Sequence, residues 1–409
     1  MIRPRAGVAT LGLVLWSALV VPRPVMGLDL PEALRQAASS NPTLEARAAM
    51  VEAARRRVAP AGAWPAPMLE LGVVNVPTNG RFDMDMMTMK MVGLSQRVPV
   101  FGSNGLSRRA AREGVIRESA AAQMTGFEII GMTWEAYADV RFASELVQAV
   151  EVHVAVMDRL VQSARARFES GNGRLEDLLR AQAERSGIVR DLVAFQTEER
   201  NARARLDALR GVEPGGAVDS LAPMPAADPV ALDAWLAEVG PGHPRLREME
   251  AAANGYRFSA RAARRMTWPD LELRASYGRR GALEGGIKQD DMFSTSVGFM
   301  LPVFAGASGR SEGAEMDAMA RASEAERRGA GLELHRQVVS AHADAEGARR
   351  TVSLLADSVI AIQHRAVEAS WTSYRAGTTD LWRVFESTHA LYAEEIALVR
   401  ARQEQARAE

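Results

Sequence analysis

The sequence predicts a mainly helical protein that contributes four strands to a membrane β-barrel shared between copies. Three observations support this: an internal duplication, two very long stretches without proline, and two pairs of segments that alternate apolar and polar residues. The hydrophobic fraction of 47% excludes a disordered chain, and the formal net charge of -1 leaves no basic surface for nucleic acid. Cysteine is absent, which excludes disulfides and thiolate metal sites.

Residues 1–27 have the layout of a secretory signal peptide. Arg3 and Arg5 precede an apolar run from about Ala6 to Val21, and small residues before Leu28 suit cleavage. The alternative is a membrane anchor, but the run is short and is followed by prolines. No later segment approaches the 18 or so apolar residues of a spanning helix. We therefore expect an exported mature chain without a transmembrane helix.

The duplication divides the mature chain into two repeats. Four short matches recur in the same order, separated by 202 to 206 positions: 41–45 with 243–247, 67–71 with 269–273, 98–101 with 301–304, and 167–171 with 373–377. Such regular spacing predicts two copies of one structural unit. We place the first repeat at 28–212 and the second at 230–409, joined by a Pro- and Gly-rich linker at 213–229.

Each repeat is predicted to contain a very long helix. No proline occurs between Val100 and Glu213 or between Val303 and Glu409, and both stretches are rich in helix-forming Ala, Arg, Glu and Leu. We expect long helices over 103–211 and 306–407, each reversing at glycines, Gly171 and Gly173 in the first and Gly377 in the second. The first arm would be roughly 100 Å long, far beyond the size of a compact domain.

The alternating segments predict two β-hairpins, at 67–98 and 269–302. In the second, Leu271, Leu273 and Tyr277 lie opposite Glu272 and Arg274. Strands of about ten residues can cross an outer membrane when tilted. The alternative is a pair of soluble hairpins with one buried face. Four strands cannot close a barrel, and open sheet edges are not tolerated in lipid, so a membrane-spanning sheet requires strands from several copies.

Two motifs resemble the TolC-like outer-membrane efflux protein family. Residues 92–102, Val-Gly-Leu-Ser-Gln-Arg-Val-Pro-Val-Phe-Gly, resemble its junction between strand and helix, and residues 374–381 resemble its periplasmic turn. The resemblance covers the whole mature chain. It implies a homotrimer with a barrel in outer-membrane lipid and a helical tunnel in the periplasm. It also implies a periplasmic adaptor protein and an inner-membrane RND-type transporter as partners, with no cofactor. The start of the first repeat and the Met-rich strand are similar to the heavy-metal branch (copper/silver or cobalt-zinc-cadmium).

The resemblance also implies a gate at the periplasmic tip. Tyr374 matches the family's gating tyrosine, and Asp177 matches its carboxylate partner on a neighbouring coiled coil. Glu386 matches a constricting carboxylate, and Asp380 lies in the same turn. Arg383 stands where a second carboxylate is expected, which allows an Arg383–Glu386 ion pair instead. The alternative for each residue is a solvated charge on a helix tip.

Five methionines are weak candidates for a metal site, because thioethers bind Cu(I) and Ag(I). They are Met84, Met86, Met87, Met89 and Met91. Alternation places the last three opposite Thr88 and Lys90, on the lipid side if the polar residues line the lumen. We therefore expect lipid-facing or packing roles for them. No catalytic or nucleotide-binding motif occurs, so an enzyme is not expected.

Two functions remain after this reading. The leading one is a passive conduit of a tripartite efflux system, possible cargoes including heavy-metal cations. The alternative is a periplasmic coiled-coil adaptor or scaffold without a pore. Hairpins of membrane length with an outward apolar face favour the conduit, because the β-domains of an adaptor are soluble.

Overall fold

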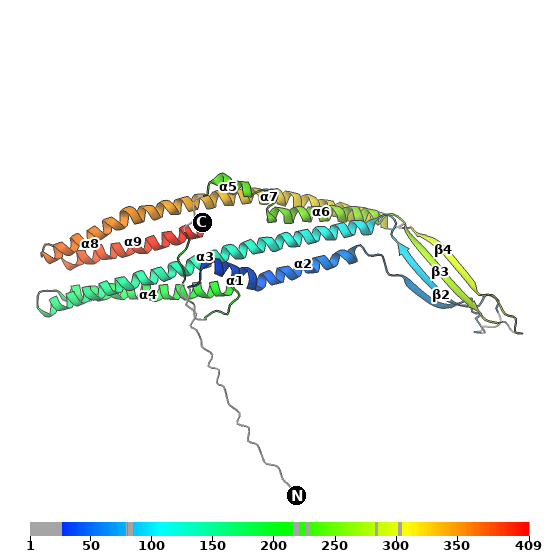
Figure 1. The fold of residues 1–409 in the computed structure, drawn as a ribbon, viewed down its shortest axis with the longest axis horizontal. Helices are drawn as coiled ribbons and strands as arrows, with labels where there is room; N and C mark the ends of the chain where they lie inside the picture. Colours follow the sequence, from blue (N-terminus) through cyan, green and yellow to red (C-terminus); the bar gives the residue numbers. More distant parts are fainter. Residues whose placement is uncertain are drawn as a thin grey trace, which may run out of the picture.

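The computed structural model describes residues 27–78, 80, 85–215, 221–225, 230–282, 285–301 and 305–408. The predicted signal peptide up to residue 26, Met84 and the 302–304 part of the second junction motif lie outside these residues. The molecule is elongated, with a sheet at one end and two helical turns at the other (Figure 1). Among the described residues, no helix combines the length and apolar character needed to cross a bilayer.

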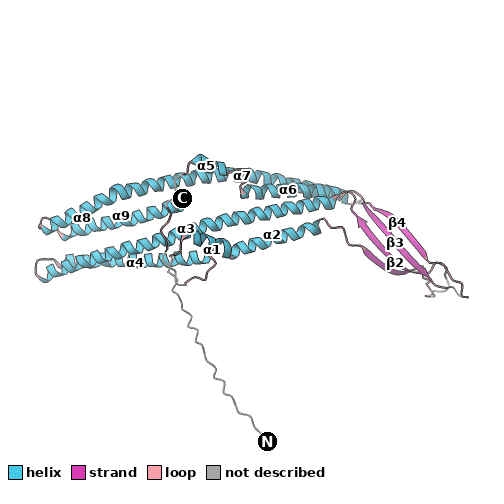
Figure 2. Cartoon of the chain, in the orientation of Figure 1, coloured by secondary structure: helices cyan, strands magenta, loops and turns pink. Residues whose placement is uncertain are grey.

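The two repeats have the same order of elements (Figure 2), which confirms the predicted duplication. The first contains α1 (Leu30–Ser40), α2 (Pro42–Ala61), β1 (Met68–Val74), β2 (Met89–Val98), α3 (Ser103–Glu169) and α4 (Leu175–Leu209). The second contains α5 (Leu232–Glu238), α6 (Pro244–Arg265), β3 (Asp270–Arg280), β4 (Met292–Met300), α7 (Ala305–Leu354), a π-helical turn (Leu355–Val359), α8 (Ile360–Arg375) and α9 (Leu381–Ala408).

Local chemistry explains where the helices before the sheet begin. The Asp29 carboxylate accepts a hydrogen bond from the Glu32 amide, and the Asn41 side chain accepts one from the Thr43 amide. These N-caps satisfy backbone donors that the first turn leaves unpaired, and a proline follows each of them within two residues. The Asn41 side-chain amide also donates to the Leu209 carbonyl at 2.9 Å, which joins the start of α2 to the end of α4.

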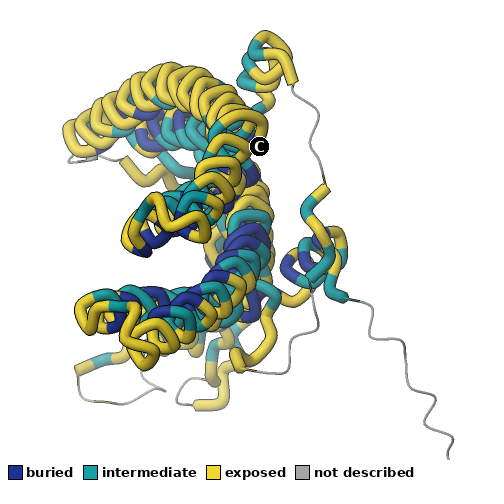
Figure 3. Tube along the Cα trace, turned by 90° about the vertical axis from the view of Figure 1, so that its left-hand side faces the viewer, coloured by how far each residue is buried: buried dark blue, intermediate teal, exposed yellow. Residues whose placement is uncertain are grey.

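Helix α6 joins the two repeats, because it packs against both α3 and α7. Its contact with α7 is close: a Cβ at Gly309 would lie 3.0 Å from the Ala263 carbonyl oxygen, and one at Gly313 would lie 3.2 Å from the Ala260 oxygen. Buried alanines on α6 and glycines on α7 thus bring the two backbones together. Viewed along the long axis, the helices form a curved wall that is open on one side (Figure 3).

The four strands form one antiparallel sheet in the order β1-β2-β3-β4. The central pair, β2 with β3, joins the two repeats, and β1 and β4 are left as edges. The strands have 7, 10, 11 and 9 residues, so both hairpins lie where they were predicted, although β1 is shorter than the expected ten residues. The Met-rich strand begins at Met89, and Met86 and Met87 precede it in a turn.

The second long arm differs from the first by a π-helical turn. The offset between repeats grows from 203 at the prolines (Pro99 and Pro302) to 206 at the turn glycines (Gly171 and Gly377), so the second arm contains three additional residues. The π-helical turn lies within this arm, whereas α3 is a continuous α-helix. A π-helical turn is a local widening of an α-helix, so the two arms differ in local helix geometry as well as in length.

Candidate functional site

The two turns at the tip have the same backbone structure. After α3, the amides of Gly171 and Asn172 donate to the carbonyls of Phe168 and Arg167; after α8, the amides of Gly377 and Thr378 donate to those of Tyr374 and Ser373. This is the Schellman arrangement, in which a residue with positive φ ends the helix. Gly171 has φ 74° and Gly377 has φ 72°, values that favour glycine. The duplicated glycines therefore place the two hairpin tips at the same end of the molecule.

Tyr374 and Asp177 line one hollow of about 530 Å³ between the two turns, together with Arg167, Arg174 and Asp380. The hydroxyl of Tyr374 is buried and has no hydrogen-bond partner among the described residues. The Arg167 guanidinium lies over its ring, 4.8 Å from the centroid. The structure thus brings the two predicted gate residues to the same place, but within one chain they do not form a hydrogen bond.

The other predicted gate residues lie at the start of α9. The Asp380 carboxylate caps this helix by accepting a hydrogen bond from the Arg383 amide at 3.2 Å. Arg383 forms the ion pair with Glu386 that the sequence allowed, also at 3.2 Å, but both side chains are more than half exposed. An exposed pair of this kind contributes about 0–1 kcal/mol. The 206-residue offset aligns Arg383 with Asp177, and Asp380 with Arg174, so the two turns carry opposite charges at equivalent positions.

A buried polar group above the tip was not predicted. His153 of α3 lies 2.5 Å from a carboxylate oxygen of Glu395 on α9, and its ring packs edge-on against Tyr392. The hydroxyl of Tyr392 donates to Asp191 of α4 at 3.2 Å. Burial raises the pKa of Tyr392, and the Asp191 carboxylate adds to the rise, so the hydroxyl remains a donor. These contacts join α9 to both helices of the first hairpin.

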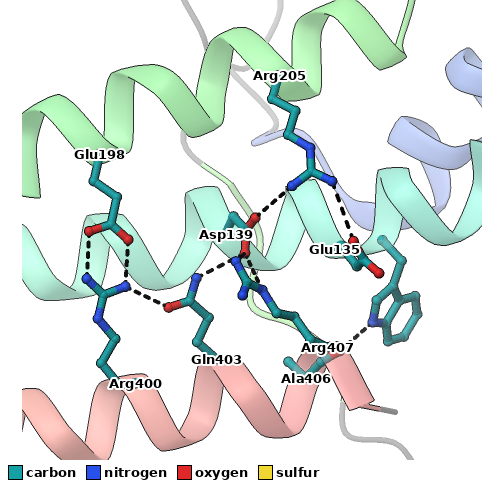
Figure 4. Close-up of polar contacts among 9 residues, drawn as sticks. Glu135, Asp139, Glu198, Arg205, Arg400, Gln403, Ala406 and Arg407 are labelled. Atoms are coloured by element: carbon teal, nitrogen blue, oxygen red, sulfur yellow. Dashed lines mark hydrogen bonds and ion pairs between the residues drawn. The ribbon is translucent and has the colours of Figure 1, made fainter. Parts of the chain in front are cut away.

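A second network joins the last turns of α9 to the first repeat (Figure 4). Arg400 forms a bidentate ion pair with Glu198 of α4, at 2.5 and 2.6 Å. Asp139 of α3 is buried and accepts hydrogen bonds from Gln403 at 3.0 Å and Arg407 at 2.7 Å. The spacing of these three side chains puts them on one face of α9, which the sequence could have indicated. Their partners, however, lie about 200 or more positions away.

The strand register corrects the predicted direction of the methionines. Leu71, Val92, Tyr277 and Phe293 are paired in one row across the sheet and belong to its apolar face. The adjacent row, Gly72, Met91, Gly278 and Met292, belongs to the opposite face, with Glu70, Ser276 and Ser294 in the next row. Met89 and Met91 therefore lie on the polar face, and the expectation that they lie on the side opposite the polar residues is wrong.

Lys90 does not mark the polar face of β2, although it is charged. Lys90 shares the apolar face with Val92 and Leu94, because alternate residues of a strand point the same way. It lies near the loop end of β2, where a long side chain can extend its charge to water. Met86 and Met87, in the preceding turn, are exposed, and Asp85 accepts a hydrogen bond from the Met87 amide.

No group of three or more His, Asp or Glu side chains in the described ranges is arranged to hold a metal ion. In this part of the chain, neither the pair His335 and His342 on α7 nor the group around Glu395, where His364 is 3.6 Å away, forms such a cluster.

The family model described as "Outer membrane efflux protein" matches residues 33–212 and 236–409, which is most of the chain and both repeats. The chain belongs to the outer membrane efflux protein family. These are the TolC-like channels that the two motifs resemble. The chain is therefore an outer-membrane protein with a periplasmic helical part, and its family is one of transport proteins and not of enzymes.

Similar proteins agree with this assignment. The outer membrane efflux protein BepC of Brucella suis biovar 1 (strain 1330) is 28% identical over 276 residues, which cover 65% of this chain and 58% of BepC. The match thus spans less than two thirds of that relative. The outer-membrane channel OprN has a similar fold with a TM-score of 0.76 at 20% identity, covering 93% of this chain and 87% of OprN. VceC of Vibrio cholerae gives 0.77 at 14% identity, covering 93% of each chain.

Proposed function

We propose that three copies of this chain form an outer-membrane channel, the passive exit duct of a tripartite efflux system. The observation that supports this most directly is the open four-stranded sheet. One of its faces exposes Leu71, Phe293 and Phe299 by 68–72%, and β1 and β4 have no further strand partner among the described residues. An apolar face suits lipid, but unpaired edges do not, so neighbouring copies are needed to close the sheet.

The curved wall of helices supports the same assembly. One chain provides an arc (Figure 3), which three copies would complete into a tube continuous with the barrel. The duct ends at the tip formed by the two Schellman turns, so we place the gate there, with Tyr374 and Asp177 in contact across neighbouring coiled coils in the closed trimer. An adaptor protein and an RND-type transporter would dock at this end and deliver cargo.

Heavy-metal cations are the cargo that we propose. This rests on the resemblance of the chain's first repeat to the heavy-metal branch and on the presence of thioethers on the polar face of the sheet. A periplasmic scaffold without a pore is the competing function. It is disfavoured by the sheet, whose exposed apolar face would be unstable in water.

The mass of the purified mature protein in mild detergent tests the assembly, and conductance in planar lipid bilayers tests the pore. We expect three copies per particle and discrete channel openings. A stable monomer would refute closure by neighbouring copies. Release of the native protein with the periplasmic fraction, without outer-membrane extraction, would favour the scaffold.

A further inference from the structure

The polar face of the sheet contains a row in which glycine and methionine alternate. Gly72 pairs with Met91, Met91 with Gly278, and Gly278 with Met292. Residues in one row of an antiparallel sheet are neighbours on the same face. Met91 and Met292 therefore flank a glycine that has no side chain to separate them.

The space over Gly278 is occupied by thioethers. A Cβ built at Gly278 would lie 2.5 Å from the sulfur of Met89, 3.3 Å from its Cγ and 3.6 Å from the Cγ of Met91. Met292 lies beside the same glycine on the next strand. A side chain at position 278 would thus displace Met89. The absence of one lets Met89 and Met91 meet over the glycine, with Met292 as its neighbour in the same row on β4.

Apolar packing accounts for only part of this arrangement. Met89 pairs with the apolar Val74 on one side but with Arg280 on the other, and Ser276 and Ser294 lie in the row next to Met91 and Met292. Met292 is 40% exposed, so its thioether is accessible from the open side of the sheet. Flexible thioethers held together and open to solvent are suitable ligands for a soft cation.

We propose that Met89, Met91 and Met292 form a transit site for a soft monovalent cation, Cu(I) or Ag(I), inside the outer end of the barrel. The proposal rests on the proposed function, because the polar face must line the lumen. The strand ends nearest these residues are those of the loops, away from the helices (Figure 1), so the site would be the last one that a cation meets before leaving.

The surroundings favour weak and selective binding. A hollow of about 760 Å³ beside Met89 is lined by Arg279, Arg280 and Lys288, with Asp291 as the carboxylate. This excess of positive charge repels hard divalent cations, which depend on oxygen ligands and charge. Neutral sulfur ligands can still bind Cu(I) or Ag(I), although less tightly than in a neutral site. A conduit needs such a balance, since a cation must bind and then leave.

Silver titration of the full-length trimer tests the proposal. The protein, labelled with ¹³C at its methionine methyl groups, is titrated with silver nitrate in chloride-free buffer and detergent. We expect three methyl signals to shift together, and the variant Met89→Leu/Met91→Leu/Met292→Leu to lose these shifts with an affinity for Ag(I) at least tenfold weaker. Leucine conserves volume but provides no ligand sulfur.

Two further variants make the test specific. Gly278→Val retains every sulfur atom but fills the space over the glycine, so it should also weaken Ag(I) binding at least tenfold. The control, Met68→Leu/Met300→Leu, removes two methionines at the helix end of the same face and should bind as the wild type does. Wild-type Ag(I) affinity in the triple variant, or shifts confined to other methionines, would overturn the proposal.

Conductance separates this inference from the channel itself. All variants should form trimers and conduct in silver-free solution as the wild type does. Normal conductance with no specific silver binding would refute the thioether site alone. The absence of conductance in the wild type would refute the proposed channel, whatever the protein binds.

Discussion

Tyr374 is the tip residue whose environment is most unusual for its chemistry. Its ring is well packed, between the Arg167 guanidinium and Trp371, whose ring centroid is 6.1 Å away. Its hydroxyl is nevertheless buried without a partner in the described chain, and buried hydroxyls are normally paired. Asp177 lines the same hollow, so a small relative movement of the two turns, or a neighbouring copy, could provide the missing acceptor.

At this scale we predict that the double variant Tyr374→Phe/Asp177→Ala loosens the closed gate. A hydrogen bond of this type contributes about 0.5–1.5 kcal/mol per copy, and three copies act on one aperture. Single-channel recordings in planar bilayers should show higher conductance or longer open times. Glu169→Gln, an exposed change at the same tip, is the control. Unchanged recordings from the double variant would locate the closure elsewhere.

At the scale of elements, α9 is attached to the first repeat by long-range polar contacts. The C-terminal end of α9 is held by the side chains of Arg400, Gln403 and Arg407. In addition, Trp134 of α3 donates a hydrogen bond to the Ala406 carbonyl at 2.6 Å. Hydrogen bonding by Arg400 holds the pKa of Glu198 below its ordinary value of 4.5. A lowered carboxyl pKa stabilises the folded state at all pH values above the ordinary pKa, and the contribution disappears as pH falls through the folded-state pKa.

We therefore expect the contribution of the Arg400–Glu198 pair to the attachment of α9 to α4 to be constant at neutral pH, to persist below pH 4.5 and to be lost in stronger acid. Hydrogen exchange of the last turns of α9 measures this attachment. In Glu198→Gln, these amides should exchange faster at neutral pH, by about 1 kcal/mol of opening free energy or less, because both partners are partly exposed. Glu394→Gln, on the same helix, is the control. Equal exchange in Glu198→Gln and wild type would mean that the pair is not stabilising.

For the whole molecule, the orientation of the sheet decides which residues meet lipid. Val297 and Ser296 are adjacent in β4 but lie on opposite faces: Val297 pairs with Leu273 on the apolar face and Ser296 with Arg274 on the polar face. The apolar face is the one that we expect in contact with the bilayer.

We predict that Val297→Arg impairs outer-membrane insertion, because arginine on the lipid side near the bilayer midplane costs roughly 2–4 kcal/mol. Ser296→Arg should insert almost normally, since its charge would face water. The yield of trimer in outer-membrane fractions measures both variants. Equal yields, or a larger loss for Ser296→Arg, would reverse the orientation of the sheet.

The sequence alone was sufficient for the architecture, because its signals are local. The absence of proline and the turn glycines Gly171 and Gly377 defined the long helices and their reversals, and alternation located all four strands. The repeat spacing showed that the unit occurs twice. Each of these features depends on residues within one element or on a comparison of the two repeats, so no knowledge of distant contacts was required.

Only the tertiary structure decided which side chains meet. Asp139 and Arg407 are 268 positions apart, and nothing in the sequence around either residue identifies the other. The direction of Met89 and Met91 also depended on register, because both sets of alternate residues in β2 include apolar side chains and Lys90 gave a misleading signal. A sheet assigns its faces through the pairing of neighbouring strands, and this pairing placed the methionines beside Gly278 on the polar face.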